Sequence, residues 1–194
     1  MKKILLRALT LLIASSFALI GCTVQQKENA QQKVDIKVLI LPKFELGEMT
    51  GDDVGEAQLY YEHYLKGGTE YDVSGNPNKL YVKDGVALLV TDVFKSNAGT
   101  SVAALLQDDR FDFSNTYFLN TGCGGGSAGT SILGDVVISS GTVDYDVGYV
   151  TDASDLKDPN NIPWFIMEEN IDDAYKKYDA NLVDKVYELV KDVP

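Results

Sequence analysis

TYFLNTGCGGGSAGTSILGDVVISSGTVDYDV (residues 116–147) holds the most informative pattern in this chain. An apolar segment, 117–119, is typical of a strand, and a glycine-dense turn follows at 122–129 before a second apolar run at 132–138. Glycine tolerates positive φ and has no Cβ, so backbone N–H groups in such a turn can approach a ligand and form an anion cradle. The same glycines also suit a tight turn between two buried strands. The spacing matches neither the dinucleotide fingerprint nor the P-loop.

The first 21 residues have the pattern of an export signal. Three basic residues precede an apolar segment, 8–20, that is too short to span a bilayer comfortably. The segment ends in Leu19-Ile20-Gly21-Cys22, which resembles the lipobox of bacterial lipoproteins, where cleavage before the cysteine leaves its thiol carrying lipid. An ordinary cleaved signal peptide or an uncleaved anchor is the alternative.

These features predict three segments: a lipoprotein signal peptide at 1–21, a lipidated Cys22 with a flexible polar tether at 22–33, and one domain at 34–194. We expect the domain to lie in the bacterial cell envelope, anchored by lipid to the membrane and facing outside the cytoplasm. Acyl chains contribute about 0.8 kcal/mol per buried CH₂, so several chains anchor a domain stably.

The mature chain is strongly acidic, which bears on its partners. The formal net charge of −12 becomes −15 once the three cations before Cys22 are removed. Such a surface argues against nucleic acid, whose phosphates need cations. His63 is the only histidine, so a His-based metal cluster is excluded and no metal is expected. With Cys22 lipidated, Cys123 has no intramolecular partner, and most lone cysteines are small buried hydrophobes.

Apolar periodicity and turn residues outline the domain. The β-branched run 34–41, ending at Pro42, suits a buried first strand. The segment 80–90, with Lys83-Asp84-Gly85 at its centre, predicts a hairpin. Helical patterns are predicted at 52–65, at 97–107 with Asn97 as the N-cap, at 172–178, and at 181–190, where apolar residues at helical spacing indicate core packing.

Four motifs occur in order along the chain: Phe111-Asp-Phe-Ser-Asn-Thr-Tyr-Phe118, Asn120-Thr-Gly-Cys-Gly-Gly-Gly126, Gly134-Asp-Val-Val-Ile-Ser139 and Asp144-Tyr-Asp146. Together they resemble the nucleoside phosphorylase superfamily, above all its purine nucleoside permease-like proteins and its methylthioadenosine/adenosylhomocysteine nucleosidases. The resemblance implies a three-layer α/β/α sandwich with a mixed central sheet. It also implies a purine nucleoside as ligand, whose N-glycosidic bond intact family members cleave. No cofactor is implied beyond phosphate as a co-substrate.

The resemblance implies site residues as well. It places Glu45, at the carboxyl end of the first strand, near the ribose and the attacking water; the alternative is one more solvated carboxylate in an acidic chain. Asn97, Gly122, Cys123 and Gly125 correspond to a cradle for ribose or phosphate. Cys123 stands where relatives carry serine, and a thiol donates a weaker hydrogen bond than a hydroxyl.

Other positions depart from the pattern of relatives or stay ambiguous. Permease-like relatives read approximately TG-x-G-x-x-NAA where this chain has TDVFKSNA at 91–98, so Asp92 and Phe94 replace two glycines. An anionic Asp92 would oppose phosphate, which disfavours phosphorolysis. Asp144 and Asp146 are two residues apart and would share one face of a strand, either as catalytic groups or as polar decoration.

Superfamily members continue beyond the point that corresponds to Pro194, with motifs that stack the base, clamp the ribose and protonate the purine. We therefore expect the last strands of the sheet to be missing. An exposed sheet edge invites pairing, so a homo-oligomer is one expectation, and the apolar run 164–167 is a candidate pocket wall or subunit contact.

Three functions are compatible with this sequence. The first is a purine nucleoside-handling lipoprotein of the phosphorylase and nucleosidase type, although catalysis by this chain lacks a visible base-protonating residue. The alternative is a lipid-anchored nucleoside-binding protein that aids nucleoside transport by hand-over to a membrane partner, without catalysis. The third is a degenerate envelope lipoprotein with no ligand.

Overall fold

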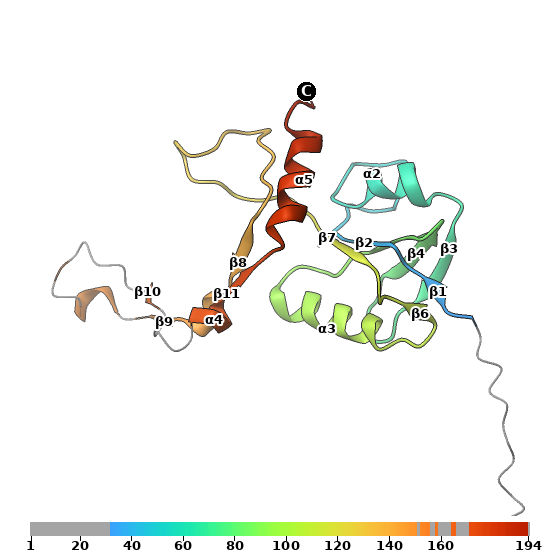
Figure 1. Ribbon diagram of the computed structural model, residues 1–194, viewed down its shortest axis with the longest axis horizontal. Helices are drawn as coiled ribbons and strands as arrows, with labels where there is room; N and C mark the ends of the chain where they lie inside the picture. The colour runs from blue at the N-terminus through green and yellow to red at the C-terminus, as the bar shows by residue number, and fades with distance from the viewer. Residues whose placement is uncertain (1–31, 151, 156–157, 159–163, 166–170, 194) are drawn as a thin grey trace, which may run out of the picture. The chain divides into compact units, whose positions relative to one another are not determined.

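The computed structural model describes residues 32–150, 152–155, 158, 164–165 and 171–193 (Figure 1). The predicted signal peptide, Cys22 and nearly all of the tether lie outside these residues, as do residues 166–167 of the apolar run. Within the described ranges, none of the helices combines the length and the hydropathy needed to cross a bilayer. The described residues form two compact units, which divide between Gly124 and Gly125.

The first unit is built on a five-stranded mixed sheet with the strand order β3-β4-β5-β2-β7. Strand β2 pairs in parallel with both β5 and β7, whereas β3, β4 and β5 pair antiparallel in succession. The carboxyl ends of β2, β5 and β7 therefore meet at one edge. The bounds are β2 (Val38–Leu41), β3 (Thr69–Asp72), β4 (Lys79–Lys83), β5 (Val86–Leu89) and β7 (Tyr117–Asn120).

The predicted first strand, 34–41, is divided in the structure. Strand β1 (Val34–Asp35) pairs in parallel with β6 (Phe111–Asp112), and the chain then enters β2 in the main sheet. Buried Ile36 separates the two strands and joins the core. The predicted hairpin is confirmed as β4 and β5. Its turn has φ of 50° at Asp84 and 81° at Gly85, the positive pair that a type I′ turn requires.

Two helical segments belong to this unit. Helix α2 (Gln58–Tyr60) continues into a π-helical turn, η1 (Tyr61–Leu65), so the predicted helix at 52–65 occupies only the second half of that range. Helix α3 (Lys95–Leu106) confirms the helix predicted at 97–107 but begins two residues earlier. The prediction of Asn97 as the N-cap is wrong, because Phe94 holds that position.

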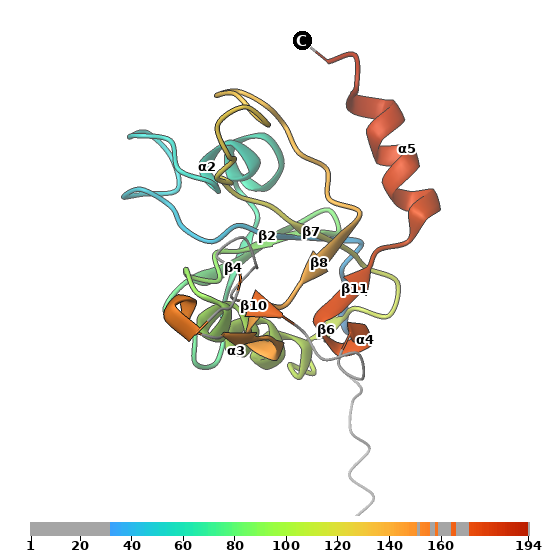
Figure 2. The same cartoon turned by 90° about the vertical axis from the view of Figure 1, so that its left-hand side faces the viewer.

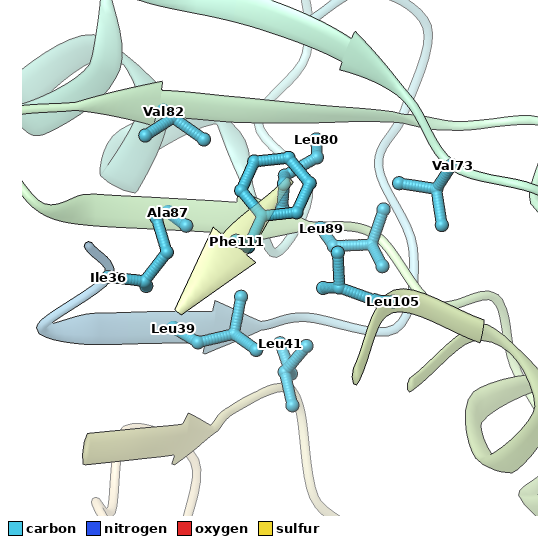
Figure 3. Close-up of a cluster of buried hydrophobic side chains, with 10 residues drawn as sticks. All are labelled: Ile36, Leu39, Leu41, Val73, Leu80, Val82, Ala87, Leu89, Leu105 and Phe111. Carbon is cyan, nitrogen blue, oxygen red and sulfur yellow. The ribbon is translucent and has the colours of Figure 1, made fainter. Parts of the chain in front are cut away.

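Apolar side chains alternate between the two faces of the sheet and form two clusters. Leu39 and Leu89 pack with Leu105 of α3 on one face (Figure 3), whereas Ile40 and Leu88 pack with residues of α2 and η1 on the other. Figures 1 and 2 show α2 and α3 on opposite sides of the sheet. The mixed α/β class is thus confirmed; a three-layer sandwich for the whole domain stays a prediction.

The second unit contains short elements. Strand β8 pairs antiparallel with β11, and β9 pairs antiparallel with β10. The bounds are β8 (Gly141–Val143), η2 (Tyr145–Val147), β9 (Tyr149–Val150), η3 (Ala153–Asp155), β10 (Trp164–Phe165), α4 (Ile171–Ala174), β11 (Tyr175–Lys177) and α5 (Ala180–Val190).

Several predictions for this unit are wrong. The apolar run 132–138 is exposed over residues 132–137 and is not a strand, because a turn in which the Asp135 N–H donates to the Ile132 carbonyl at 3.2 Å interrupts it. The predicted helix at 172–178 is cut short because 175–177 pairs with β8 as a strand.

The other two corrections concern α5 and the Asp144-Tyr145-Asp146 motif. Helix α5 confirms the helix predicted at 181–190, but in the described structure its apolar residues are exposed rather than packed in a core. Asp144 accepts a hydrogen bond at 3.0 Å from the N–H of Asp146 and caps the 3₁₀ turn η2. The two carboxylates therefore do not share the face of a strand.

Candidate functional site

The carboxyl edge of β2, β5 and β7 carries an open cavity of about 450 Å³. Ligands of open α/β sheets bind outside the carboxyl ends of the strands, and small-molecule sites span roughly 300–1,000 Å³. The cavity lies wholly within the first unit. It is lined by Leu41, Lys43, Thr91, Phe94, Lys95, Ala98, Gly99, Val102 and Asn120.

Thr91 lines this cavity and joins the chain segments that follow β2 and β5. Its N–H and its hydroxyl both donate to the carbonyl of Pro42, at 3.0 and 3.3 Å. Its own carbonyl accepts a hydrogen bond from the Ser101 hydroxyl of α3 at 3.3 Å. Since Thr91 is only 1% exposed, these bonds form in a water-poor environment and hold β2, β5 and α3 together.

Lys43 places an ammonium group at the edge of the cavity. The ammonium donates to the Leu41 carbonyl at 2.5 Å and to the side-chain oxygen of Asn120 at the end of β7. Burial lowers the pKa of Lys43 from its ordinary value, and attraction to the Glu56 carboxylate opposes that effect. An ammonium has three donors, so one remains for a ligand within the part of the chain that the structure describes.

Asn120 is oriented by its bond to Lys43. A lysine can only donate, so the amide oxygen of Asn120 must face the ammonium and the amide nitrogen must face away. Among the described residues, no protein acceptor is seen for the two N–H groups of this amide. Lys43 and Asn120 both line the cavity, so their remaining N–H groups are candidate donors to a ligand rich in acceptor oxygens or ring nitrogens.

The loop between β5 and α3 is strained. Asp92 has φ of 64°, and Phe94 has φ of 76° with ψ of 144°, a backbone region almost restricted to glycine. These are the two positions at which permease-like relatives were expected to carry glycine. The backbone at both positions thus has a conformation that glycine adopts most easily, although the residues are aspartate and phenylalanine. Phe94 is 77% exposed and lines the cavity.

Glu45 is engaged by backbone N–H groups. One carboxylate oxygen accepts from Leu46 at 2.8 Å and from Gly55 at 2.5 Å. The other accepts from Ala57 at 2.7 Å and from Gln58 at 2.5 Å, at the start of α2. The side chain thereby satisfies donors at the beginning of the helix, where negative charge is favourable. Its predicted catalytic role stays a prediction.

The glycine turn begins beside α2. Thr121 and Tyr60 share a hydrogen bond between their hydroxyls at 3.1 Å, and the Cys123 N–H donates to the Glu56 carboxylate at 2.7 Å. Cys123 is an exposed free thiol, contrary to the expectation of a buried hydrophobe. The predicted cradle residues Gly122 and Cys123 thus lie next to a carboxylate that the sequence analysis did not single out.

The remaining predicted residues lie apart from the cavity lining. Asn97 is exposed in the first turn of α3, while its neighbours Phe94, Lys95 and Ala98 line the cavity. Gly125 is the first residue of the second unit. Sequence reasoning missed Lys43, which follows β2 and Pro42, and gave no role to Asn120, which opens the second motif at the end of β7.

No group of three or more His, Cys, Asp or Glu side chains among the described residues is arranged to hold a metal ion.

The purine nucleoside permease (NUP) family model matches residues 35–193, which is most of the chain. This chain belongs to that family. The permease part of the predicted resemblance is confirmed, whereas the phosphorylase superfamily and the nucleosidases stay predictions. No curated protein and no solved structure matched.

The strained loop of this NUP-family chain generates a stability prediction. Phe94→Gly should raise the free energy of unfolding by about 1 kcal/mol, because relief of about 1–3 kcal/mol of backbone strain exceeds the cost of about 0.5–1 kcal/mol for glycine flexibility. Urea unfolding measures this change. Val93→Gly is the matched control, since Val93 is not among the described residues with positive φ, and it should destabilise. A lower free energy of unfolding for Phe94→Gly would contradict the inference that the backbone at Phe94 is strained.

The four hydrogen bonds of Glu45 generate a second prediction. Glu45→Ala should lower the free energy of unfolding by about 2–3 kcal/mol, because hydrogen bonds to a charged group are worth about 1.5–3 kcal/mol and four N–H groups lose their acceptor. Glu48→Ala, at an exposed carboxylate three residues away, should change it by about 0.5 kcal/mol or less. Urea unfolding measures the free energy of unfolding of both variants. Equal values for Glu45→Ala and Glu48→Ala would argue against the structural role of Glu45.

Proposed function

We propose that this chain is a lipid-anchored protein that binds a purine nucleoside in the cavity at the carboxyl edge of its sheet and hands it to a membrane partner. The observation that carries this proposal is the composition of that cavity. Its lining combines the N–H donors of Lys43 and Asn120 with the exposed aromatic ring of Phe94, in a chain of the purine nucleoside permease family.

The polar side of the cavity suits ribose. Lys43 donates a hydrogen bond to Asn120, which holds the two side chains in place, and their remaining N–H groups are the donors that we assign to the ligand. Ribose hydroxyls and purine ring nitrogens are acceptors of suitable size and polarity. Such neutral-ligand hydrogen bonds contribute about 0.5–1.5 kcal/mol each, and more where the donor is charged.

The aromatic side suits a purine base. The ring of Phe94 is exposed at the cavity and is positioned by a strained backbone, a combination that clusters at ligand sites. Stacking of a base on an aromatic side chain is worth about 1–3 kcal/mol. Phe94 in place of glycine therefore supplies a contact surface for the base that the resembling proteins would lack at this point.

Binding without cleavage is favoured by the state of the carboxylates. Cleavage of the N-glycosidic bond would need a carboxylate that orients water or phosphate, and Glu45 already accepts four backbone N–H groups. Asp92 adds a negative charge to the loop beside the cavity. The resemblance to the phosphorylase superfamily supports a three-layer fold for the domain, with capture of the nucleoside as its function here.

The anchor in this proposal is lipid on Cys22. The lipobox-like Leu19-Ile20-Gly21-Cys22 and the polar segment after it support this assignment. Several acyl chains at about 0.8 kcal/mol per buried CH₂ would hold the domain at the outer face of a bacterial envelope membrane.

Calorimetric titration of the full chain in mild detergent tests the binding proposal. Adenosine or inosine should bind saturably, with no free base released in chromatography of the same samples. Asn120→Ala should weaken affinity about 5- to 10-fold, the equivalent of one hydrogen bond of about 1–1.4 kcal/mol. Asn115→Ala, which removes an exposed amide outside the cavity, should leave affinity unchanged.

Two outcomes of this titration would overturn the proposal. Saturable binding accompanied by release of the purine base would show that the chain cleaves the nucleoside instead of only binding it. A folded chain with no saturable binding of any purine nucleoside would remove the nucleoside as ligand.

Fractionation of cells tests the anchor. Cys22→Ser should move the protein from the membrane fraction and abolish incorporation of radiolabelled fatty acid, because the lipid acceptor is lost. Cys123→Ser is the matched control, since it removes the other cysteine, and it should remain labelled and membrane-bound. Labelling that persists in Cys22→Ser would show that the anchor lies elsewhere.

A further inference from the structure

The Glu56 carboxylate is held by backbone donors from two different loops. One oxygen accepts from the N–H of Lys43, after β2, at 2.7 Å. The other accepts from the N–H of Cys123, in the glycine turn after β7, at 2.7 Å. Two N–H groups that converge on one oxyanion form the arrangement by which turns bind anions.

The glycine turn is shaped around this carboxylate. A Cβ at Gly122 would lie 2.7 to 2.9 Å from the three carboxylate atoms of Glu56, closer than carbon atoms come to such groups, and φ at Gly122 is 153°. The hydroxyl pair of Tyr60 and Thr121 holds the same loop from the next turn of the helical segment. The contact between Glu56 and the turn is therefore specific to glycine at position 122.

Charge reinforces the arrangement. The Glu56 carboxylate also attracts the ammonium of Lys43, which opposes the effect of burial on the pKa of that lysine. A phosphate group bound at these donors would meet the Glu56 carboxylate at close range. Like charges at such distances repel strongly in a partly buried site.

We propose that Glu56 is a built-in anion that occupies the N–H groups of Lys43 and Cys123, excludes phosphate from the glycine turn, and so restricts the ligand to uncharged nucleosides. The restriction of ligand rests on the proposed function, in which a nucleoside occupies the adjoining cavity. The exclusion of phosphate rests on the hydrogen bonds and the charge of Glu56 alone.

Thermal unfolding of the full chain with inorganic phosphate tests the exclusion. Glu56→Ala frees both N–H groups and the Lys43 charge, so phosphate at about ten times its Kd should raise Tm by about 3–5 °C relative to chloride at equal ionic strength. The wild-type chain should show no such difference. Glu62→Ala is the matched control, because Glu62 is a hydrogen-bonded carboxylate of the adjacent π-helical turn that does not touch the glycine turn.

The same titrations separate this inference from the proposed function. A Tm of Glu56→Ala that is insensitive to phosphate, or an equal rise in the wild type, would overturn the built-in anion. Where Glu56→Ala fails to fold, Glu56→Gln serves instead, since the two N–H groups bond different carboxylate oxygens and the amide replaces one of these oxygens with an NH₂ group, which cannot accept. Absence of nucleoside binding in the wild type would reject the proposed function. The test of phosphate exclusion by Glu56 does not depend on that outcome.

A comparison of two ligands tests the restriction to uncharged nucleosides. The wild type should bind adenosine at least about 10-fold more tightly than adenosine 5′-monophosphate, a difference of about 1.4 kcal/mol, and Glu56→Ala should narrow that ratio. Equal affinities of the wild type for the two ligands would contradict the restriction to uncharged nucleosides.

Discussion

The parallel pairing of β2 with both β5 and β7 is the constraint on which the first unit depends. It brings the ends of three strands, separated by up to about eighty residues of chain, to a single edge. The loops that leave this edge then have to satisfy their own backbone groups, since no strand continues there. Thr91, Lys43 and Asn120 do so by bonding one loop to the next. These bonds fix the loops that line the cavity, and the bond from Ser101 to Thr91 ties them to α3.

Carboxylates provide much of the remaining order at this edge. Glu45 accepts N–H groups at the start of α2, and Glu56 accepts N–H groups from two other loops. An acidic chain would be expected to keep such charges in solvent, where they contribute little to stability. Here two of them replace the hydrogen bonds that regular secondary structure would have supplied, which explains how irregular loops remain fixed beside a binding cavity.

Local chemistry made part of this fold predictable. The β-branched run that contains β2, the Asp84-Gly85 turn and the strand at Tyr117–Asn120 follow from side-chain period and turn preference, and the structure confirms them. The start of α2 and the role of Glu56 did not follow, because they depend on contacts more than ten residues apart. The run 132–138 was wrongly predicted to be a buried strand, because its apolar content suggests one although a turn interrupts it. Asn97 was misassigned because the preceding strained loop, invisible to propensity, begins the helix earlier.

In the loop at Asp92 and Phe94, the conformation of the backbone is independent of the chemical character of the side chains. Its backbone follows a path that glycine adopts most easily, yet it carries a carboxylate and an aromatic ring. Substitution at such a site changes what the cavity can contact without moving the strands or helix that frame it. Exchange of the Phe94 side chain can thus alter the contacts that the cavity offers a ligand, with the sheet left unaltered and only a modest change in stability.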